Sequence, residues 1–345
     1  MSPRRDPIER AADRGRDLYE VATWDQRSEF DGIAVAVYEG LRPAARWVVI
    51  GIATIITVAL FAFGGLATIS NPIVGTFVLL SLVPALLLAG YVYRSDVTTH
   101  EPLPMLAGTF LLAIVFSTFA SIVNTFTSAA FTSVGLPTQG FVGGVLFFVF
   151  IVGPGEEFVK WLAVRIYAFR RAEFDAVIDG AVYGAVAGLG FATIENAFYI
   201  TRFIEATGTT VSIVEAGSNI AALRALAGPG HVIYSAISGF YLGLAKFNRE
   251  HYGPIVVKGL LLAALFHATY NISVGYVPGI ISFVSPLDDF AASIVYIIVY
   301  DTLIGLFLYR KLRNYKRAYR DAGVREHRNR PNDPELTEFD GPPRP

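Results

Sequence analysis

The sequence predicts an all-α protein, a polytopic transmembrane helical bundle of about eight spans. Hydrophobic residues make up 53% of the 345 residues and charged residues only 17%, whereas soluble domains are usually about 25% charged. Eight apolar stretches reach the roughly 20 residues that a hydrocarbon core requires of a helix. The chain has no cysteine, which excludes disulfides and thiolate chemistry. The sequence contains no basic patch with interleaved aromatic residues, so we expect no nucleic acid partner. The apolar composition predicts the lipid bilayer as the environment.

The first 46 residues are polar and mix acids with bases, as in RRDPIERAADRGRDLYE. No apolar run lies close to Met1, as a signal peptide would require. We therefore expect 1–46 to form a cytoplasmic, partly helical extension that behaves as a solvated charged tail. A transmembrane helical domain should follow at 47–310, with spans near 47–69, 73–93, 103–126, 141–169, 176–200, 220–244, 255–276 and 283–309.

The last segment, 311–345, begins with basic residues and ends in the Pro-rich, acidic sequence NDPELTEFDGPPRP. Such a composition has too little apolar surface to fold by burial, which predicts a disordered cytoplasmic tail.

Loop charges predict the orientation of the spans. Lys and Arg concentrate in the segments that eight spans would place on one side, while the opposite loops, around Asn71 and at 127–139 and 277–289, contain none. Only Arg202, in the 201–219 loop, departs from this pattern. Because basic residues gather in cytoplasmic loops, we expect a multi-pass protein of the cell membrane with both termini in the cytoplasm. The basic residues on that side are Arg42, Arg46, Arg94, Arg170, Arg171, Lys246, Arg249, Arg310, Lys311 and Arg313.

Two adjacent acids, Glu156 and Glu157, lie inside an apolar stretch that is long enough to cross a bilayer. A charged side chain at membrane depth costs roughly 2.5–3.5 kcal/mol on insertion scales, so such residues usually have a function. Lys160 follows one turn later, and its spacing predicts an ion pair with Glu156. Gly-Pro-Gly sequences at 153–155 and 228–230 predict breaks in the helices, which membrane proteins tolerate beside cavities.

Three further apolar segments carry isolated polar residues. Glu195 is followed by Asn196, His231 follows the second Gly-Pro-Gly sequence, and His267 and Asn271 lie on one helical face. Straight helices would place some of these side chains nearer the outer face than others. We expect the breaks and helix tilt to bring them together in a water-accessible cavity in the mid-to-outer half of the bilayer.

Gly180, Gly184 and Gly188 recur every fourth residue in the segment that carries Glu195. Small residues at this spacing let two membrane helices approach closely. The pattern therefore predicts close packing of this span against a neighbour rather than chemistry.

Carboxylates and imidazoles without a Ser or Cys nucleophile arrangement favour the activation of water. A Glu can take a proton from water with help from His, while His and Asn donors stabilise an oxyanion. The same groups could instead hold zinc, although the sequence contains no H-E-x-x-H motif. The residues leave both schemes open, so the cofactor is either none or one zinc ion. The candidate zinc ligands are Glu157, Glu195, His231 and His267, and Lys160 and Asn196 would support the site.

Two other classes of function are compatible with charged residues in spans. One is a transporter for protons or divalent cations, which often has repeated halves, and no internal repeat is present. The other is a non-catalytic scaffold that binds membrane helices.

The motifs resemble those of the PrsW family of intramembrane proteases, distant relatives of the type II CAAX prenyl endopeptidases. Their order and spacing agree over roughly residues 75–310. The matching stretches are YRSDVTTHEPLPML (93–106), which is similar to an acidic loop of the family, EEFVKW (156–161), DGAVYGAVAGLGFATIENAFY (179–199), GPGHVIYSAISGFYLG (228–243) and FHATYN (266–271).

The resemblance implies a CAAX-protease-like core and an endopeptidase that cleaves membrane-anchored proteins, such as anti-sigma factors, near the outer membrane face. The family is described both as glutamic-type and as metal-dependent. The 1–46 extension, the first span and a long 201–219 loop depart from the family pattern. Carried across by motif, the catalytic residues would be the pair Glu156 and Glu157, together with Glu195, His231, His267 and, at the position of an oxyanion donor in the CAAX-type relatives, Asn271.

Overall fold

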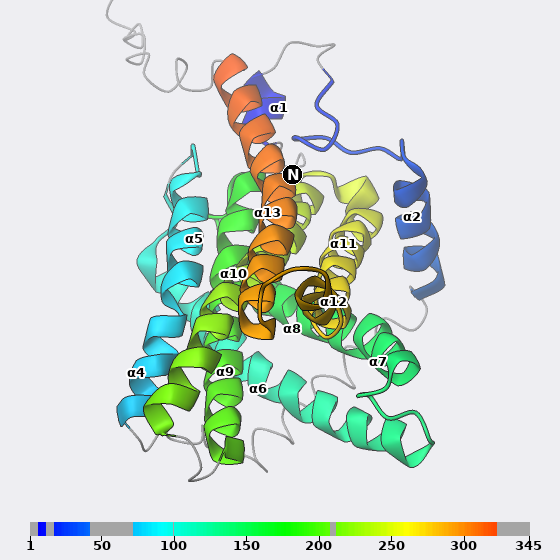
Figure 1. Ribbon diagram of the computed structural model, residues 1–345. Helices are drawn as coiled ribbons and strands as arrows, with labels where there is room; N and C mark the ends of the chain where they lie inside the picture. The colour runs from blue at the N-terminus through cyan, green and yellow to red at the C-terminus, as the bar shows by residue number, and fades with distance from the viewer. Residues whose placement is uncertain (1–5, 12–16, 42–71, 99, 208–211, 323–345) are drawn as a thin grey trace, which may run out of the picture.

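A computed structural model describes residues 6–11, 17–41, 72–98, 100–207 and 212–322, and within these ranges the chain is helical without strands (Figure 1). The helices are α1 (Pro7–Ala11), α2 (Glu29–Leu41), α4 (Pro72–Ser81), α5 (Val83–Arg94), α6 (Leu103–Ser133), α7 (Phe141–Phe147), the π-helix η1 (Phe148–Val152), α8 (Gly153–Ile166), α9 (Val177–Thr207), α10 (Ile213–Phe247), the 3₁₀ turn η2 (Arg249–His251), α11 (Tyr252–Ser273), α12 (Val277–Val284) and α13 (Asp289–Asp321).

Seven of the predicted spans correspond to helices that are long and apolar enough to cross a membrane. The predicted span at 47–69 lies outside the described residues. Two spans are built from consecutive elements, α4 with α5 and α7 with η1 and α8. The last span begins at Asp289 rather than near 283, because α12 precedes it as a separate short helix. The predicted loop at 201–219 was wrong, because α9 continues to Thr207 and α10 begins at Ile213.

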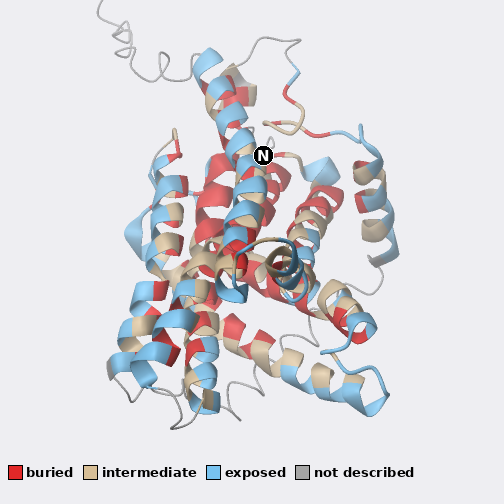
Figure 2. Cartoon of the chain, viewed as in Figure 1, coloured by how far each residue is buried: buried red, intermediate tan, exposed pale blue. Residues whose placement is uncertain are grey.

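The centre of the bundle is the pair α9 and α10, along which the buried residues concentrate (Figure 2). The glycine stripe of α9 permits this contact. A Cβ atom on Gly180, Gly184 or Gly188 would lie 2.1, 2.2 or 2.3 Å from a backbone oxygen of α10. Any side chain there would force the helices apart, so the prediction of close packing is confirmed.

The N-terminal segment packs on the bundle instead of forming a solvated tail. Its Glu20 and Asp31 bind Lys258 of α11, and Glu20 also binds Lys311 of α13. The Tyr19 hydroxyl donates to Asp31 at 2.5 Å. We call Tyr19, Glu20, Asp31, Lys258 and Lys311 the anchor cluster. Two nearly buried lysines in an apolar bundle require opposite charges, and the polar composition of this segment supplies them.

Backbone contacts reinforce the anchor cluster. Asn248, just after α10, accepts the backbone N–H of Trp24 at 2.9 Å and donates to the Ala22 carbonyl at 3.0 Å. A Cβ atom on Gly253 would lie 2.0 Å from the ring of Tyr38, so α2 lies directly against α11 (Figure 1). The N-terminal segment thus connects three spans, α10, α11 and α13.

Both described ends of the chain lie at the same end of the bundle (Figure 1). The Tyr315 hydroxyl of α13 donates to the buried Asp6 carboxylate at 3.1 Å, next to α1. The predicted basic tail is helical from Lys311 to Asp321, because α13 extends that far. Its predicted disordered part, 323–345, lies outside the described residues.

Candidate active site

Four spans bring five polar residues to one place in the bundle interior. The Nδ1 atom of His267 lies 2.9 Å from Glu157 Oε1, and its Nε2 atom lies 3.6 Å from Glu156 Oε2. The rings of His231 and His267 meet nearly perpendicularly, with centroids 5.1 Å apart. Glu195 Oε2 forms an ion pair with His231 Nε2. We call these residues the site cluster; α8, α9, α10 and α11 supply them.

Backbone irregularities position the site cluster. The π-helix η1 directly precedes α8, and a Cβ atom on Gly153 would lie 2.8 Å from the Ala264 carbonyl of α11. The predicted break at 153–155 is thus a π-turn followed by a close helix contact, and such turns are frequent at functional sites. The predicted break at 228–230 was wrong, because α10 continues through Pro229. Proline removes one helical hydrogen bond, and packed membrane helices tolerate that loss.

Lys160 pairs with a different acid from the one its spacing predicts. Its Nζ atom donates to Glu157 Oε1 at 2.6 Å and lies 3.0 Å from His231 Nδ1. Both i+3 and i+4 neighbours share a helix face, and the position of His231 on α10 selects Glu157. Glu156 instead accepts a hydrogen bond from Asn124 Nδ2 of α6 at 2.8 Å. Asn124 was not among the predicted site residues, because a single Asn in an apolar span carries little signal.

A second basic residue, Arg224 of α10, also belongs to the site. Its Nη2 atom donates to Glu195 Oε2 at 2.6 Å, and its Nε atom donates to Asn196 Oδ1 at 2.9 Å. Asn196 in turn donates to Ser81 Oγ at 3.0 Å. Asn196 is therefore a partner of Arg224 rather than of the histidines. Arg224 was missed, although an arginine inside an apolar span is itself a signal.

Two more polar residues border the site cluster. The ring of Tyr234 stacks on His267, with centroids 5.5 Å apart and planes at 27°. Asp301 of α13 lies next to Tyr234, since a Cβ atom on Gly230 would lie 3.0 Å from Tyr234 Oη and 3.2 Å from Asp301 Oδ1. Asp301 was missed, although an acid within a predicted span is an evident candidate by the same rule that singled out Glu156.

Three side chains of the site cluster form a possible set of metal ligands. One ligand atom each from Glu156, His231 and His267 lie within 4.8 Å of one another. The Oε2 atoms of Glu156 and Glu157 are buried without a hydrogen-bond partner, which is unusual for buried polar atoms. Two imidazoles with a carboxylate are a set that zinc takes in hydrolases, so these residues fit a zinc ion. The set contains Glu156, which was not among the predicted ligands, in place of Glu157 and Glu195.

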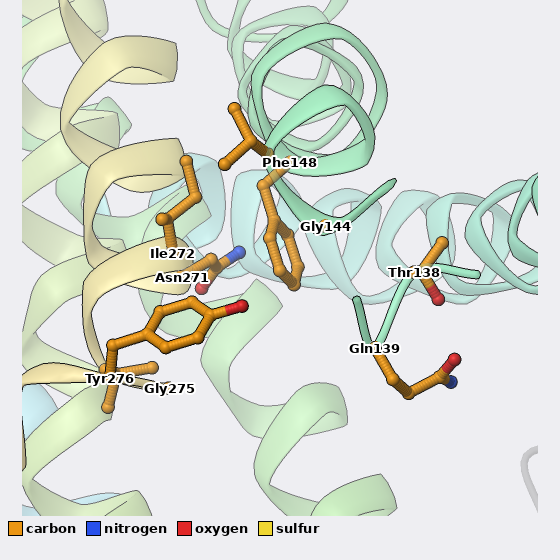
Figure 3. A pocket seen from close by; sticks show the side chains of 10 residues that line it. Thr138, Gln139, Gly144, Phe148, Asn271, Ile272, Gly275 and Tyr276 are labelled. Atoms are coloured by element: carbon orange, nitrogen blue, oxygen red, sulfur yellow. The ribbon is translucent and has the colours of Figure 1, made fainter. Parts of the chain in front are cut away.

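Two further predicted features are not part of the site cluster. Asn271 follows His267 by one turn of α11 and lines a neighbouring pocket (Figure 3). In the acidic loop at 93–106, Glu101 accepts the hydroxyl of Tyr183. Tyr183 precedes Glu195 by twelve residues of α9, or about 18 Å along the axis, so this loop does not reach the site.

Comparison with known proteins places these motifs in a family. The model of the PrsW family of intramembrane metalloproteases matches residues 101–303. The protease PrsW of Geobacillus kaustophilus is 31% identical over 191 residues, which cover 55% of this chain and 76% of the relative. The protease PrsW of Bacillus subtilis is 31% identical over 194 residues, 55% and 78% of the two chains, and that of Clostridioides difficile is 26% identical over 195 residues, 56% and 76%. No solved structure matches the chain.

Proposed function

The chain belongs to the PrsW family of intramembrane proteases and is a hydrolase, and on this premise we propose that it cleaves membrane-anchored proteins with water activated at the site cluster. The observation that carries the proposal is the convergence of Glu156, His231 and His267 with buried carboxylate oxygens that have no partner. Unpaired buried acceptors are costly, and a reacting water or a cation would satisfy them.

Glu195 is the acid best placed to take the proton from the attacking water. Its side chain is 17% exposed, against 6% for Glu156 and none for Glu157. Arg224 Nη2 donates to Glu195 Oε2 at 2.6 Å and fixes the position of this carboxylate. The accepted proton would pass from Glu195 to the nitrogen of the leaving amine, as general acid–base catalysis requires.

Glu157 and Lys160 orient the imidazoles. Glu157 accepts from the Nδ1 side of His267, and Lys160 faces Nδ1 of His231. These contacts leave the Nε2 atoms directed toward Glu156 and Glu195. The pairing of Glu157 with His267 is the usual support of a metal-binding imidazole. Glu156, His231 and His267 would hold a zinc ion, which when bound supplies an acidic water and polarises the peptide carbonyl.

We place the cut near the outer membrane face, in a single-span protein such as an anti-sigma factor. His267 lies in the last third of α11, and α11 runs from the end of the bundle that holds the described termini toward the middle of the bundle (Figure 1). With both termini in the cytoplasm, as the loop charges favour, the site cluster would lie in the mid-to-outer half of the bilayer. Asn271, one turn beyond His267, would donate to the carbonyl oxygen of the substrate.

The test is cleavage of a single-span substrate by the purified, folded protein in liposomes. Glu156→Gln should reduce the rate at least 10³-fold with unchanged thermal unfolding, and undiminished cleavage would disprove the role of the site cluster. Zinc content, measured by elemental analysis, should be one ion per wild-type chain and should fall in Glu156→Gln. Wild-type activity that persists without bound metal would refute the zinc ligands but not the hydrolytic function.

A further inference from the structure

A pocket of about 390 Å³ lies between the segment that leads into α8 and the end of α11, the helix that carries His267 (Figure 3). One wall comes from the segment that runs from the loop before α7 to the start of η1. It includes Thr138, Gln139 and the first π-helical residue, Phe148. The other wall comes from the end of α11 and the turn after it. Pockets that bind small ligands or side chains usually have volumes of about 300–1,000 Å³, so this one is large enough for a substituent of a peptide.

The pocket is continuous with elements that carry the site cluster. Asn271 lines it and follows His267 by four residues on the same face of α11, about 6 Å along the helix axis. On the opposite wall, Phe148 begins the π-helix that leads into α8 and Glu156. An extended peptide advances about 3.3 Å per residue. A peptide bond held at the site cluster would therefore place a side chain about two residues away in this pocket.

The lining of the pocket selects for uncharged groups. None of its ten residues carries a charge. The ring of Phe148 faces the tips of Asn271 and Tyr276, whose amide nitrogen and hydroxyl point toward it (Figure 3). Burying an unpaired charge against such walls is strongly unfavourable, whereas an aromatic or large aliphatic side chain would contact two aromatic rings.

We propose that this pocket is a specificity subsite that binds an aromatic or large aliphatic side chain of the substrate, about two residues from the scissile bond. The proposal rests on the proposed hydrolytic function and adds the substrate feature that the enzyme recognises. The residues that determine this preference would lie in the turn after α11 and at the start of the π-helix. The turn directly follows the helix that carries His267, and the π-helix directly precedes the helix that carries Glu156.

The test uses single-span substrates that carry Phe, Ala, Asp or Lys at each of the three positions on either side of the cut. Wild-type kcat/KM should be at least tenfold higher for Phe than for Ala at one position about two residues away, and lowest for Asp and Lys. Equal kcat/KM for all four side chains at every position would overturn the subsite. No detectable cleavage of any substrate would instead contradict the proposed function.

Gly275 offers a way to fill the pocket without disturbing the fold. A Cβ atom there meets only the Ile272 carbonyl, at 3.5 Å. Gly275→Val should reduce the Phe-to-Ala ratio of kcat/KM at least fivefold, while the matched variant Gly279→Val, at an open position of α12 outside the pocket, should keep the wild-type ratio. If Gly275→Val fails to fold, Tyr276→Ala removes one aromatic wall and should reduce the same ratio. An unchanged ratio in every folded pocket variant would overturn the proposal.

Discussion

The protein contains two buried polar clusters of similar composition, and they differ in how completely their atoms are paired. In the anchor cluster, Glu20 and Asp31 face Lys258 and Lys311, and all four carboxylate oxygens accept at least one hydrogen bond. In the site cluster, the Oε2 atoms of Glu156 and Glu157 accept none. Burial of charge is common to both, so burial alone does not indicate chemistry.

This difference has a physical basis. In a fully paired cluster every carboxylate oxygen already has a partner within the protein. Its ion pairs and hydrogen bonds therefore stabilise the packing of the helices. An unpaired buried oxygen costs folding free energy, and it persists where a reacting molecule or a bound ion satisfies it during function. The comparison therefore predicts that substitutions in the site cluster reduce activity, whereas substitutions in the anchor cluster reduce stability.

After Glu156→Gln, the largest effect is expected for Glu195→Gln. Loss of the proposed proton acceptor should reduce the cleavage rate about 10³-fold, within the range of general acid–base catalysis. The midpoint of thermal unfolding should fall by less than for Lys258→Met, because the amide keeps the size of the side chain and its oxygen can still accept a hydrogen bond from Arg224. Glu205→Gln, an exposed position on the same helix, is the matched control and should cleave at the wild-type rate. Equal activity of the two variants would remove Glu195 from the mechanism.

Lys258→Met should act on stability instead. It leaves the Asp31 carboxylate and part of the Glu20 carboxylate without their cation, and breaking a buried ion pair from one side costs about 3–5 kcal/mol. Denaturant unfolding in detergent measures the loss, with the exposed Arg313→Met as control. The folded fraction should still cleave substrate at low temperature. A stable variant with no activity would reverse the assignment of the two clusters.

Asn124→Ala should have a smaller effect on activity. Asn124 holds Glu156 Oε1 at 2.8 Å, and loss of such outer partners typically costs 10–100-fold in metal affinity or activity. Cleavage kinetics and zinc content would both be measured, next to Thr125→Ala, an exposed neighbour on α6. If both variants behave as wild type, Glu156 does not depend on this contact for its orientation.

The smallest effect is the pH dependence of the anchor cluster. Burial opposes ionisation of Asp31, but hydrogen bonds from Lys258, Tyr19 and Ser28 outweigh it and lower the pKa of this carboxyl below its ordinary value. Burial likewise opposes ionisation of Glu20, and the charge of Lys311 helps to lower its pKa. A lowered pKa in the folded state stabilises the fold above the unfolded value, near pH 4, and this stabilisation is lost as the pH falls further.

Thermal unfolding in detergent between pH 6 and pH 3 measures this loss. The midpoint of the wild type should fall as the solution is acidified, and Asp31→Asn should fall less steeply because one of the titrating carboxyls is absent. Parallel curves for the two proteins would show that Asp31 does not contribute to the acid sensitivity.

The sequence alone predicted the seven spans that the structure describes and the five members of the site cluster, because both signals are local. An apolar run of 20 residues identifies a span, and a charge inside it is conspicuous, as for Glu156 and His267. Arg224 and Asp301 satisfy the same rule, but they were not among the predicted site residues. The same rule identified Glu195 and His231. Straight helices would place these two residues at other depths than Glu156 and His267, and the packing of the helices brings all of them together.

The anchor cluster could not be predicted in this way. Glu20 pairs with Lys258 and Lys311, more than 200 residues later in the chain, and a polar N-terminal segment has the composition of a solvated tail. The partner of Lys160 was also unpredictable, because the i+3 and i+4 acids are equivalent until α10 supplies His231. Tertiary contacts decide both cases.

The π-helix at Phe148–Val152 has a consequence for how the length of this segment can vary. A π-turn contains one residue more than an α-turn would, and successive helical residues are about 100° apart around the axis. Deleting one residue from Phe148–Val152 would therefore rotate all of α8 and direct a different glutamate at each histidine. A chain without this extra residue would present the two acids to the histidines in another order, so insertions and deletions in this segment would alter the site as much as substitutions of the acids themselves.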